Sequence, residues 1–383
     1  MIVHQPKILV LFGTRPEAIK LAPVIKELEK QSIETVVVSS SQHGHLIQPF
    51  LDLFGVVVDH DLRVMREKQS LNDVCFRVIE RLDKLLQAES PDVIVVQGDT
   101  TTALAGAIAA FNRNIAIGHV EAGLRSSDRN SPFPEEMNRR LISVLATFHF
   151  AATEQNRCTL ISEGVDPDSV IVTGNPVVDS LNSVVENLRP GERFASVLEA
   201  TRGLKRILLT THRRESFGAA MSANLRVLKE FVKKHDDVCL LFPVHPNPNV
   251  RSVTESILGD AERVVLLEPL GYSDFVAAML NSWLIVSDSG GVQEEAPSLG
   301  KPLLVLRQNT ERPEAVTAGV ARLVGGDPKE LERLLQENYD DDTWIRSLSS
   351  IPNPFGDGLA AKRIAEFFKN NWRGRASAKM RRR

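Results

Sequence analysis

The chain has 383 residues, of which 43% are hydrophobic and 25% are charged, and its formal net charge is -3. This near-neutral balance gives no reason to expect nucleic acid as a partner, and no apolar run approaches the roughly 20 residues that a membrane span needs. We expect a cytoplasmic enzyme of two domains, because the chain is longer than one typical domain and its first residues run into a strand rather than a cleavable signal.

Short β-branched runs alternate with longer helical patterns along the chain, and the alternation occurs twice. It is typical of βαβ units, so we predict an α/β fold of two Rossmann-like domains whose parallel sheets face a central cleft. The predicted strands are 8–12, 35–39, 93–96, 115–120, 148–151 and 170–173, then 206–210, 238–242, 264–267, 283–286 and 303–306. The domains are expected at 1–176 and 177–358, and 359–383 supplies a helix that crosses back to the first domain and a basic tail.

The first strand ends in GTRPEAIK, which is a weak signal of an anion site on its own. The chain turns at Gly13, Arg15 can reach a phosphate, and Pro16 begins a helix that carries Lys20 one turn later. The strand at 93–96 ends in QGDTTTA. Taken alone, this motif favours Asp99 as the N-cap of the next helix over a site carboxylate.

The strand at 115–120 leads into GHVEAGLRS, which places His119, Glu121 and Arg125 around a glycine. The loop SPFPEEMNRR then delivers Glu135, Glu136, Asn138 and Arg139. Glu135 and Arg139 stand four residues apart on one helix face. They can pair to fix a carboxylate in one pose, or form an exposed salt bridge of little energetic value.

In the second half, THRRESFG follows a strand and offers His212, Arg213 and Arg214. The segment PVHPNPNV places His245 between two prolines, where a lone histidine is more often structural than catalytic.

The segment SDSGGVQEEAPSLGKP, residues 287–302, lies between two predicted strands. Gly290 and Gly291 let the backbone approach an anion, and the amides of the following helix would hold a diphosphate. Glu294 and Glu295 are expected in the first turn of that helix, where an acid can accept both hydroxyls of a ribose. A capped helix after a buried strand explains such a glycine pair equally well on its own.

Acids from the first half, together with His212 and a nucleotide site from the second, suit the removal or addition of a proton next to a diphosphate leaving group. Carboxylates take a proton from carbon only when they are desolvated and positioned. When several carboxyl groups lie close together their pKa values are pushed apart, so that one can act as the base and another as the acid.

Ten motifs in this order resemble the bacterial non-hydrolysing UDP-N-acetylglucosamine 2-epimerases over nearly the whole chain. They are GTRPEAIK, GDTTTALAGA, GHVEAGLRS, PFPEEMNRR, VTGNPVVDS, THRRESFG, PVHPNPNV, SDSGGVQEEAPSLGKP, TERPEAV and GDGLAAKRI. The resemblance implies a fold like that of the two-domain GT-B glycosyltransferases and a homodimer. It also implies interconversion of UDP-N-acetylglucosamine (UDP-GlcNAc) and UDP-N-acetylmannosamine (UDP-ManNAc), by anti elimination of UDP to 2-acetamidoglucal and syn re-addition.

The resemblance also assigns site residues. The acids expected to handle the C2 proton and position the sugar are Asp99, Glu121 and Glu135, and His212 is expected beside the departing diphosphate with Arg15 and Lys20. The remaining substrate contacts are expected at Arg139, Phe275 (uracil), Ser289, Gly290 and Gly291 (phosphate), Glu295 (ribose) and Arg312. No cofactor is needed, in agreement with the lack of GxGxxG at the first strand, and Cys75, Cys158 and Cys239 lack metal or redox spacing.

Two positions depart from the family pattern. The chain reads QHGH at 42–45, so Gly44 replaces the usual arginine in a loop with which some members bind a second UDP-GlcNAc as an activator. Candidate activator contacts are Gln42, Gln69, Arg213 and His245. Leu270 stands where some relatives present a polar side chain near the base.

Other functions stay open on the sequence alone. A hydrolysing relative would use the same acids to release N-acetylmannosamine and UDP. A GT-B glycosyltransferase would use the same nucleotide site without three N-terminal acids, and an inert sensor would not need the acids and His212. The aliphatic helix at 103–110 can form a subunit interface or pack within the sheet sandwich.

Overall fold

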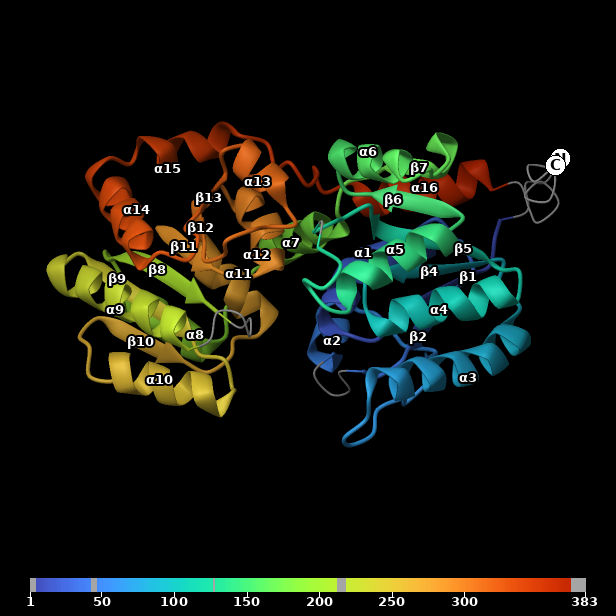
Figure 1. Cartoon of the computed structure of the whole chain (residues 1–383), viewed down its shortest axis with the longest axis horizontal. Helices are drawn as coiled ribbons and strands as arrows, with labels where there is room; N and C mark the ends of the chain where they lie inside the picture. The colour runs from blue at the N-terminus through green and yellow to red at the C-terminus, as the bar shows by residue number, and fades with distance from the viewer. Residues whose placement is uncertain (1–4, 43–46, 127, 212–217, 373–383) are drawn as a thin grey trace. The chain divides into compact units, whose positions relative to one another are not determined.

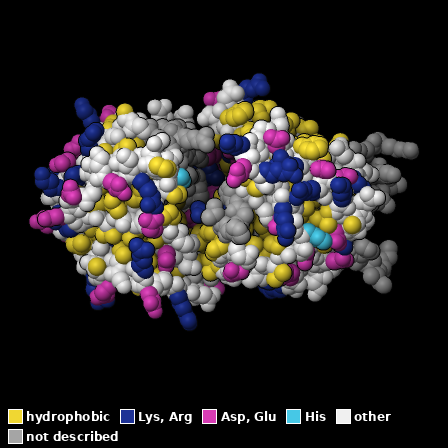
Figure 2. All heavy atoms as spheres, turned by 90° about the horizontal axis from the view of Figure 1, so that it is seen from below, with side chains coloured by type: hydrophobic (Ala, Val, Ile, Leu, Met, Phe, Trp, Pro, Cys, Tyr) yellow, Lys and Arg dark blue, Asp and Glu magenta, His cyan; other side chains and the backbone are white. Residues whose placement is uncertain are grey.

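The computed structural model describes residues 5–42, 47–126, 128–211 and 218–372. Within these ranges, no helix combines the length and the apolar composition that crossing a membrane requires. Basic and acidic side chains lie interspersed on the face seen in Figure 2, which agrees with the near-neutral net charge.

The chain forms two compact units, each built around a parallel sheet (Figure 1). Unit 1 contains Met1–Ser180 and Phe355–Arg383, and unit 2 contains Leu181–Pro354. The chain thus leaves unit 1 once and returns to it once, whereas the sequence placed the two boundaries at 176 and 358. The predicted α/β class with two parallel sheets is confirmed.

Unit 1 has a seven-stranded sheet in the order β3-β2-β1-β4-β5-β6-β7, with every pair parallel. Its strands are β1 (Ile8–Phe12), β2 (Thr35–Ser39), β3 (His60–Asp61), β4 (Val93–Gln97), β5 (Ala116–Ala122), β6 (Phe148–Ala151) and β7 (Val170–Val172). Its helices are α1 (Arg15–Lys30), α2 (Gln48–Phe54), α3 (Leu71–Glu89), α4 (Thr101–Asn112), α5 (Glu135–Leu145), α6 (Glu154–Ser162) and α16 (Ala360–Asn371). Helix α7 (Pro176–Glu186) begins in unit 1 and leads out of it.

Unit 2 has a six-stranded parallel sheet in the order β10-β9-β8-β11-β12-β13. Its strands are β8 (Lys205–Thr210), β9 (Val238–Pro243), β10 (Val264–Leu267), β11 (Leu284–Ser287), β12 (Leu303–Val305) and β13 (Ala321–Leu323). Its helices are α8 (Glu192–Ala200), α9 (Ala219–Lys234), α10 (Pro248–Leu258), α11 (Tyr272–Leu280), α12 (Gly290–Glu295), α13 (Pro313–Thr317), α14 (Pro328–Asp340) and α15 (Thr343–Ser347). Short 3-10 helices occupy Pro167–Ser169 in unit 1, and Ala296–Leu299 and Leu348–Ser350 in unit 2.

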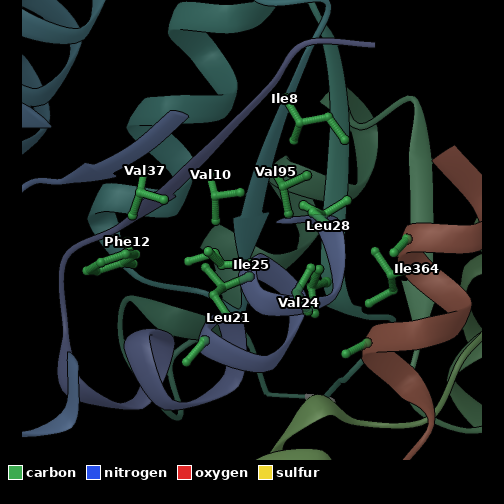
Figure 3. Close-up of a cluster of buried hydrophobic side chains, with 14 of the residues drawn as sticks. Ile8, Val10, Phe12, Leu21, Val24, Ile25, Leu28, Val37, Val95 and Ile364 are labelled. Carbon is green, nitrogen blue, oxygen red and sulfur yellow. The ribbon is translucent and has the colours of Figure 1, made fainter. Parts of the chain in front are cut away.

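The first strand shows why the sheet of unit 1 is covered on both faces. All five residues of β1 are buried, and successive side chains point to opposite faces of a strand. Val10 and Phe12 join a cluster that includes α1 and Ile364 of α16 (Figure 3). Leu9 and Leu11 join a second cluster with α3 and α4. The carboxyl ends of the central strands are therefore fixed between two packed layers.

The small side chains of helix α4 pack inside unit 1. Its alanines, including Ala103, Ala105 and Ala107, are buried between α3 and α5. A Cβ on Gly106 would lie 2.4 Å from Leu11 Cδ2, so the small residues permit close approach of the helix to β1.

Candidate active site

The carboxyl ends of three neighbouring strands of unit 1, β1, β4 and β5, lie at one edge of the sheet, and two of the predicted acids, Asp99 and Glu121, lie there. Glu121 lies in β5 at a register shift between Val120 and Ala122, and its φ of 64° is left-handed. Its carboxylate accepts hydrogen bonds from Lys20 Nζ (2.5 Å), from Asn175 Nδ2 (3.1 Å) and from Gln97 Nε2. A buried carboxylate with this many donors, one of them cationic, is held in one pose.

Asp99 is a paired carboxylate, not a helix cap. Arg139 donates to its Oδ2 from Nε (2.8 Å) and Nη2 (2.7 Å), and Asn138 Nδ2 donates to its backbone oxygen (2.8 Å). The N-cap of α4 is Thr100, whose Oγ1 accepts from the amide of Ala103 (3.0 Å). The interpretation of Asp99 as an N-cap is therefore wrong.

The first turn of α5 contributes a second acid, Glu136, to which the sequence analysis assigned no role. Glu136 is fully buried and accepts from Arg139 Nη1 (3.2 Å), Arg140 Nε (3.0 Å) and the Ser126 amide (2.9 Å). Burial by itself would raise the pKa of Glu136, but the Ser126 amide and the two guanidinium groups hold it below its usual range. Arg139 thus joins Asp99 to Glu136, while Glu135 lies half-buried at the first position of α5.

Glu17 is a further carboxyl at these strand ends that the sequence analysis missed. Its Oε2 accepts from the amides of Gly13 (3.0 Å) and Thr14 (2.7 Å), and its Oε1 accepts from Thr100 Oγ1 (2.7 Å). Burial raises the pKa of Glu17 to about 7, against the lowering effect of these donors. The signal was present in the sequence, because Thr14 and Glu17 form a capping box.

His119 supports the turn that carries Asp99. Its Nε2 lies 2.8 Å from the oxygen of Gly98, whose φ of 69° makes the turn before Asp99. Burial lowers the pKa of His119 to about 3, so the ring is neutral and donates to this oxygen. Arg125 is bound to Glu163 (2.6 Å) and serves the packing of α6.

Arg15 and Lys20 differ in their surroundings. Arg15 is exposed at the start of α1 and its guanidinium lies 5.2 Å from the ring centre of Phe50, whereas Lys20 is buried against Glu121. Arg15 is therefore the more accessible cation at the end of β1.

In unit 2, the two glycines after β11 have different environments. A Cβ on Gly290 would lie 2.5 Å from Arg312 Nη1 and 2.9 Å from Arg312 Cζ, so this glycine makes room for the guanidinium. The nearest atom to a Cβ on Gly291 is Ser289 Oγ, at 3.9 Å. Gly291 faces open space, whereas Gly290 is required for packing.

The two glutamates of α12 have separate partners. Glu294 is fully buried and accepts from Arg312 Nε (2.6 Å), and Arg312 Nη1 also binds Glu311 (2.8 Å). Glu295 accepts from the hydroxyl of Tyr272 (2.6 Å). Both glutamates lie at the end of α12, so the expectation that they occupy its first turn is wrong. Phe275 lies half-buried on α11, just beyond Leu270.

The remaining predicted residues fall into two groups. His212, Arg213 and Arg214 lie outside the described residues, as do Gly44 and His45 of the departing loop. Three candidate activator contacts already bind neighbours within the chain. Gln42 accepts from Thr102 Oγ1 (3.1 Å), Gln69 accepts from Arg77 Nη1 (2.6 Å), and His245 Nδ1 accepts from the Asn247 amide (3.2 Å).

Comparisons with known proteins agree with one another. A family model described as UDP-N-acetylglucosamine 2-epimerase matches residues 26–369. The UDP-N-acetylglucosamine 2-epimerase of Escherichia coli K12 is 45% identical over 371 residues, which are 95% of this chain and 99% of that protein.

Two solved structures extend the likeness to the fold. The Neisseria meningitidis UDP-GlcNAc 2-epimerase bound to UDP-GlcNAc has a TM-score of 0.88 and 42% identity, and the match covers 95% of this chain and all of that one. The Methanocaldococcus jannaschii UDP-GlcNAc 2-epimerase, in complex with UDP-GlcNAc and UDP, has a TM-score of 0.81 and 32% identity, covering 95% of this chain and 99% of that one.

Proposed function

The chain belongs to the UDP-N-acetylglucosamine 2-epimerase family, and from this membership we propose how its residues divide the work of the reaction. The protein is an isomerase that epimerises UDP-GlcNAc at C2. The two paired carboxylates, Asp99 and Glu121, carry the proposal, because they lie at the carboxyl ends of the adjacent strands β4 and β5 and each is held by a cation.

The reaction proceeds in two stages. A base removes the proton from C2 while UDP leaves C1 from the opposite face, so that a C1–C2 double bond forms in 2-acetamidoglucal. UDP then adds back to C1, and an acid returns a proton to C2 on the same face. Both fragments are recovered and no electrons are gained or lost, so the steps need no redox cofactor. The product is UDP-ManNAc.

Unit 1 supplies the proton chemistry in this proposal. Asp99, Glu121 and Glu135 handle the C2 proton and position the sugar, and Arg139 keeps Asp99 in place. Glu121 is buried and Asp99 and Glu135 are half-buried, so these carboxylates are less solvated than free acids, which favours taking a proton from carbon. Arg15, Lys20 and His212 are assigned to the diphosphate that departs.

Unit 2 supplies the nucleotide site. We assign the phosphates to Ser289, Gly290 and Gly291, with Gly291 as the glycine that a ligand can approach. Glu295 is assigned to the ribose hydroxyls, with the Tyr272 hydroxyl fixing its carboxylate. The uracil is assigned to Phe275. Arg312 packs against Gly290 and is held there by its ion pairs with Glu294 and Glu311, so it supports the phosphate turn.

A second UDP-GlcNAc as activator, and a homodimer, complete the proposal. The activator would contact Gln42, Gln69, Arg213 and His245, without the arginine that Gly44 replaces. The dimer is supported by exposed apolar side chains on α3 and α5, the two helices that pack against α4, such as Phe76 and Val144. Sedimentation velocity of the wild type and of Val144→Glu tests the dimer; a monomeric wild type would contradict it.

Proton NMR of the purified protein with UDP-GlcNAc in deuterated water tests the reaction. We expect UDP-ManNAc with deuterium at C2 and UDP still attached at equilibrium. Accumulation of free N-acetylmannosamine and UDP would instead indicate the hydrolysing reaction. An unchanged spectrum in the presence of bound UDP-GlcNAc would indicate a transferase or a sensor and defeat the proposal.

A further inference from the structure

Two motifs that the reaction leaves unexplained, VTGNPVVDS at 172–180 and FGDGLAAKRI at 355–364, meet where the chain leaves unit 1 and returns to it. We call these two segments the crossing clasp. The amide of Asn175 donates to the oxygen of Phe355 (2.7 Å). Gly174 and Gly356 have φ values of 87° and 136°, and a Cβ on Gly356 would lie 3.1 Å from Gly174 Cα. Both positions require glycine for the two backbones to touch.

Further hydrogen bonds hold the two segments of the crossing clasp together on both sides of this contact. Asp179, on α7, accepts from the amides of Ala360 (3.2 Å) and Ala361 (2.9 Å) at the start of α16. Arg363, one turn into α16, donates to the oxygen of Thr173 (2.9 Å). Hydrogen bonds therefore run in both directions between the outgoing and the returning segment, and α16 is anchored in the core of unit 1 (Figure 1).

The side chain of Asn175 points from the crossing clasp to the acid site. It is only 1% exposed, its Oδ1 accepts from the amide of Val177 (3.1 Å), and its Nδ2 donates to Glu121 Oε1 (3.1 Å). One residue thus uses its backbone to hold the clasp, its side-chain oxygen to start α7, and its side-chain nitrogen to reach the carboxylate.

Glu121 needs such a partner because β5 alone does not orient it. Its left-handed φ lies at a register shift, where the regular alternation of the strand is broken. Lys20, on α1, donates to the same oxygen as Asn175, and Gln97, on β4, donates to the other. Lys20 and the neutral His119 are among the charged and titratable groups beside the carboxylate.

We infer that Asn175 is a positioning residue for Glu121, held in place by the crossing clasp, and that its amide keeps this carboxylate in the pose that the chemical step uses. The inference rests on the proposed role of Glu121. A neutral donor suits this position, because it fixes the carboxylate without adding a charge beside Lys20.

Two variants of the full-length enzyme separate positioning from folding. Asn175→Ala removes the donor, and Asn175→Asp keeps the size and the acceptor for Val177 but places a second carboxylate against Glu121. Asn338→Ala is the matched control, since Asn338 is also 1% exposed but donates to Leu334 on α14 of unit 2. Steady-state kcat and KM are measured with UDP-GlcNAc across pH, together with thermal unfolding.

We expect kcat of Asn175→Ala to fall by about 10- to 100-fold with KM nearly unchanged. The Glu121 carboxylate is no longer held in its reactive orientation, whereas the contacts that bind the substrate remain. In Asn175→Asp, the acidic limb of the kcat profile should move to higher pH, because a like charge raises the pKa of a neighbouring carboxyl. Asn338→Ala should lose thermal stability and keep the wild-type kcat.

Wild-type kcat and pH profile in folded Asn175→Asp would overturn the inference, as would an equal loss of kcat in Asn338→Ala. The variant Glu121→Gln separates the proposed role of Glu121 from the inferred role of Asn175. If Glu121→Gln turns over like the wild type, the proposed function of Glu121 is wrong. If Glu121→Gln is inactive and both Asn175 variants behave as wild type, only the role of Asn175 is wrong.

Discussion

Replacing either glycine of the turn after β11 by alanine should have opposite effects on stability. In Gly290→Ala, the new methyl group lies 2.5 Å from Arg312 Nη1, so the guanidinium must retreat by about half an ångström to restore even the tightest normal contact of 3.0 Å. Arg312 is 6% exposed and bound to Glu294 (2.6 Å) and Glu311 (2.8 Å), so the movement lengthens two buried ion pairs.

Overpacking of this kind costs about 1–3 kcal/mol, and complete loss of a buried pair costs about 3–5 kcal/mol. The lower unfolded-state entropy of alanine returns only about 0.4–1 kcal/mol. We therefore expect Gly290→Ala to lower the free energy of unfolding by about 2 kcal/mol, which for a unit of this size is about 4–8 °C in Tm. Gly291→Ala meets nothing closer than 3.9 Å, so only the entropic gain applies and its Tm should equal or exceed that of the wild type.

Calorimetric unfolding and UDP titration of both variants provide the assay. If the diphosphate binds against the backbone of Gly291, the variant Gly291→Ala should remain stable but bind UDP about 10-fold more weakly, because the added methyl group occupies the space of the ligand. An equal loss of stability in the two variants, or a Gly290→Ala protein as stable as the wild type, would refute the packing argument.

Three more substitutions test the separate sites. Asp99→Asn should reduce epimerisation by at least about 100-fold and keep UDP binding, and wild-type turnover would defeat the assignment of this acid. Glu17 has a folded-state pKa of about 7 against an ordinary 4.5, so its contribution to stability is present below pH 4.5 and falls by about 3 kcal/mol as the pH rises to 7. Urea unfolding between pH 4.5 and 8 should show Glu17→Gln gaining stability relative to the wild type as the pH rises. If the difference in the free energy of unfolding between the two proteins stays constant, the raised pKa of Glu17 is contradicted. Tyr272→Phe should weaken UDP binding by about 10-fold through Glu295, whereas Tyr339→Phe, which loses a similar hydroxyl–carboxylate bond to Asp237, should leave UDP affinity unchanged.

The sequence predicted the strands well because their signal is local. Runs such as Ile8–Phe12 are apolar along their whole length, and the ends of each predicted strand agree with the structure within two residues. The strands β3 and β13 escaped prediction, since their short sequences, HD and ARL, contain no run of β-branched residues.

The partners within the site could not be predicted in the same way. Arg139 binds Asp99 across 40 residues of chain, and Lys20 binds Glu121 across 101 residues, so both pairs depend on the order of strands in the sheet. The helical spacing of Glu135 and Arg139 predicted a local pair, which does not account for the bond of Arg139 to Asp99. Glu17 had a local signal, its capping box with Thr14, but it was a signal of helix geometry rather than of chemistry.

The discontinuity of unit 1 has a consequence for synthesis of the protein. The first strand is made early, but the core around it also needs Ile364 and Phe368 of α16, which the ribosome delivers only after all of unit 2. Until then, the face of the sheet that carries Phe150 lacks its aromatic partners on α16. The unit that is begun first is therefore finished last, and a chain stopped before residue 360 leaves a complete unit 2 attached to an open apolar sheet, which is the state that chaperones recognise.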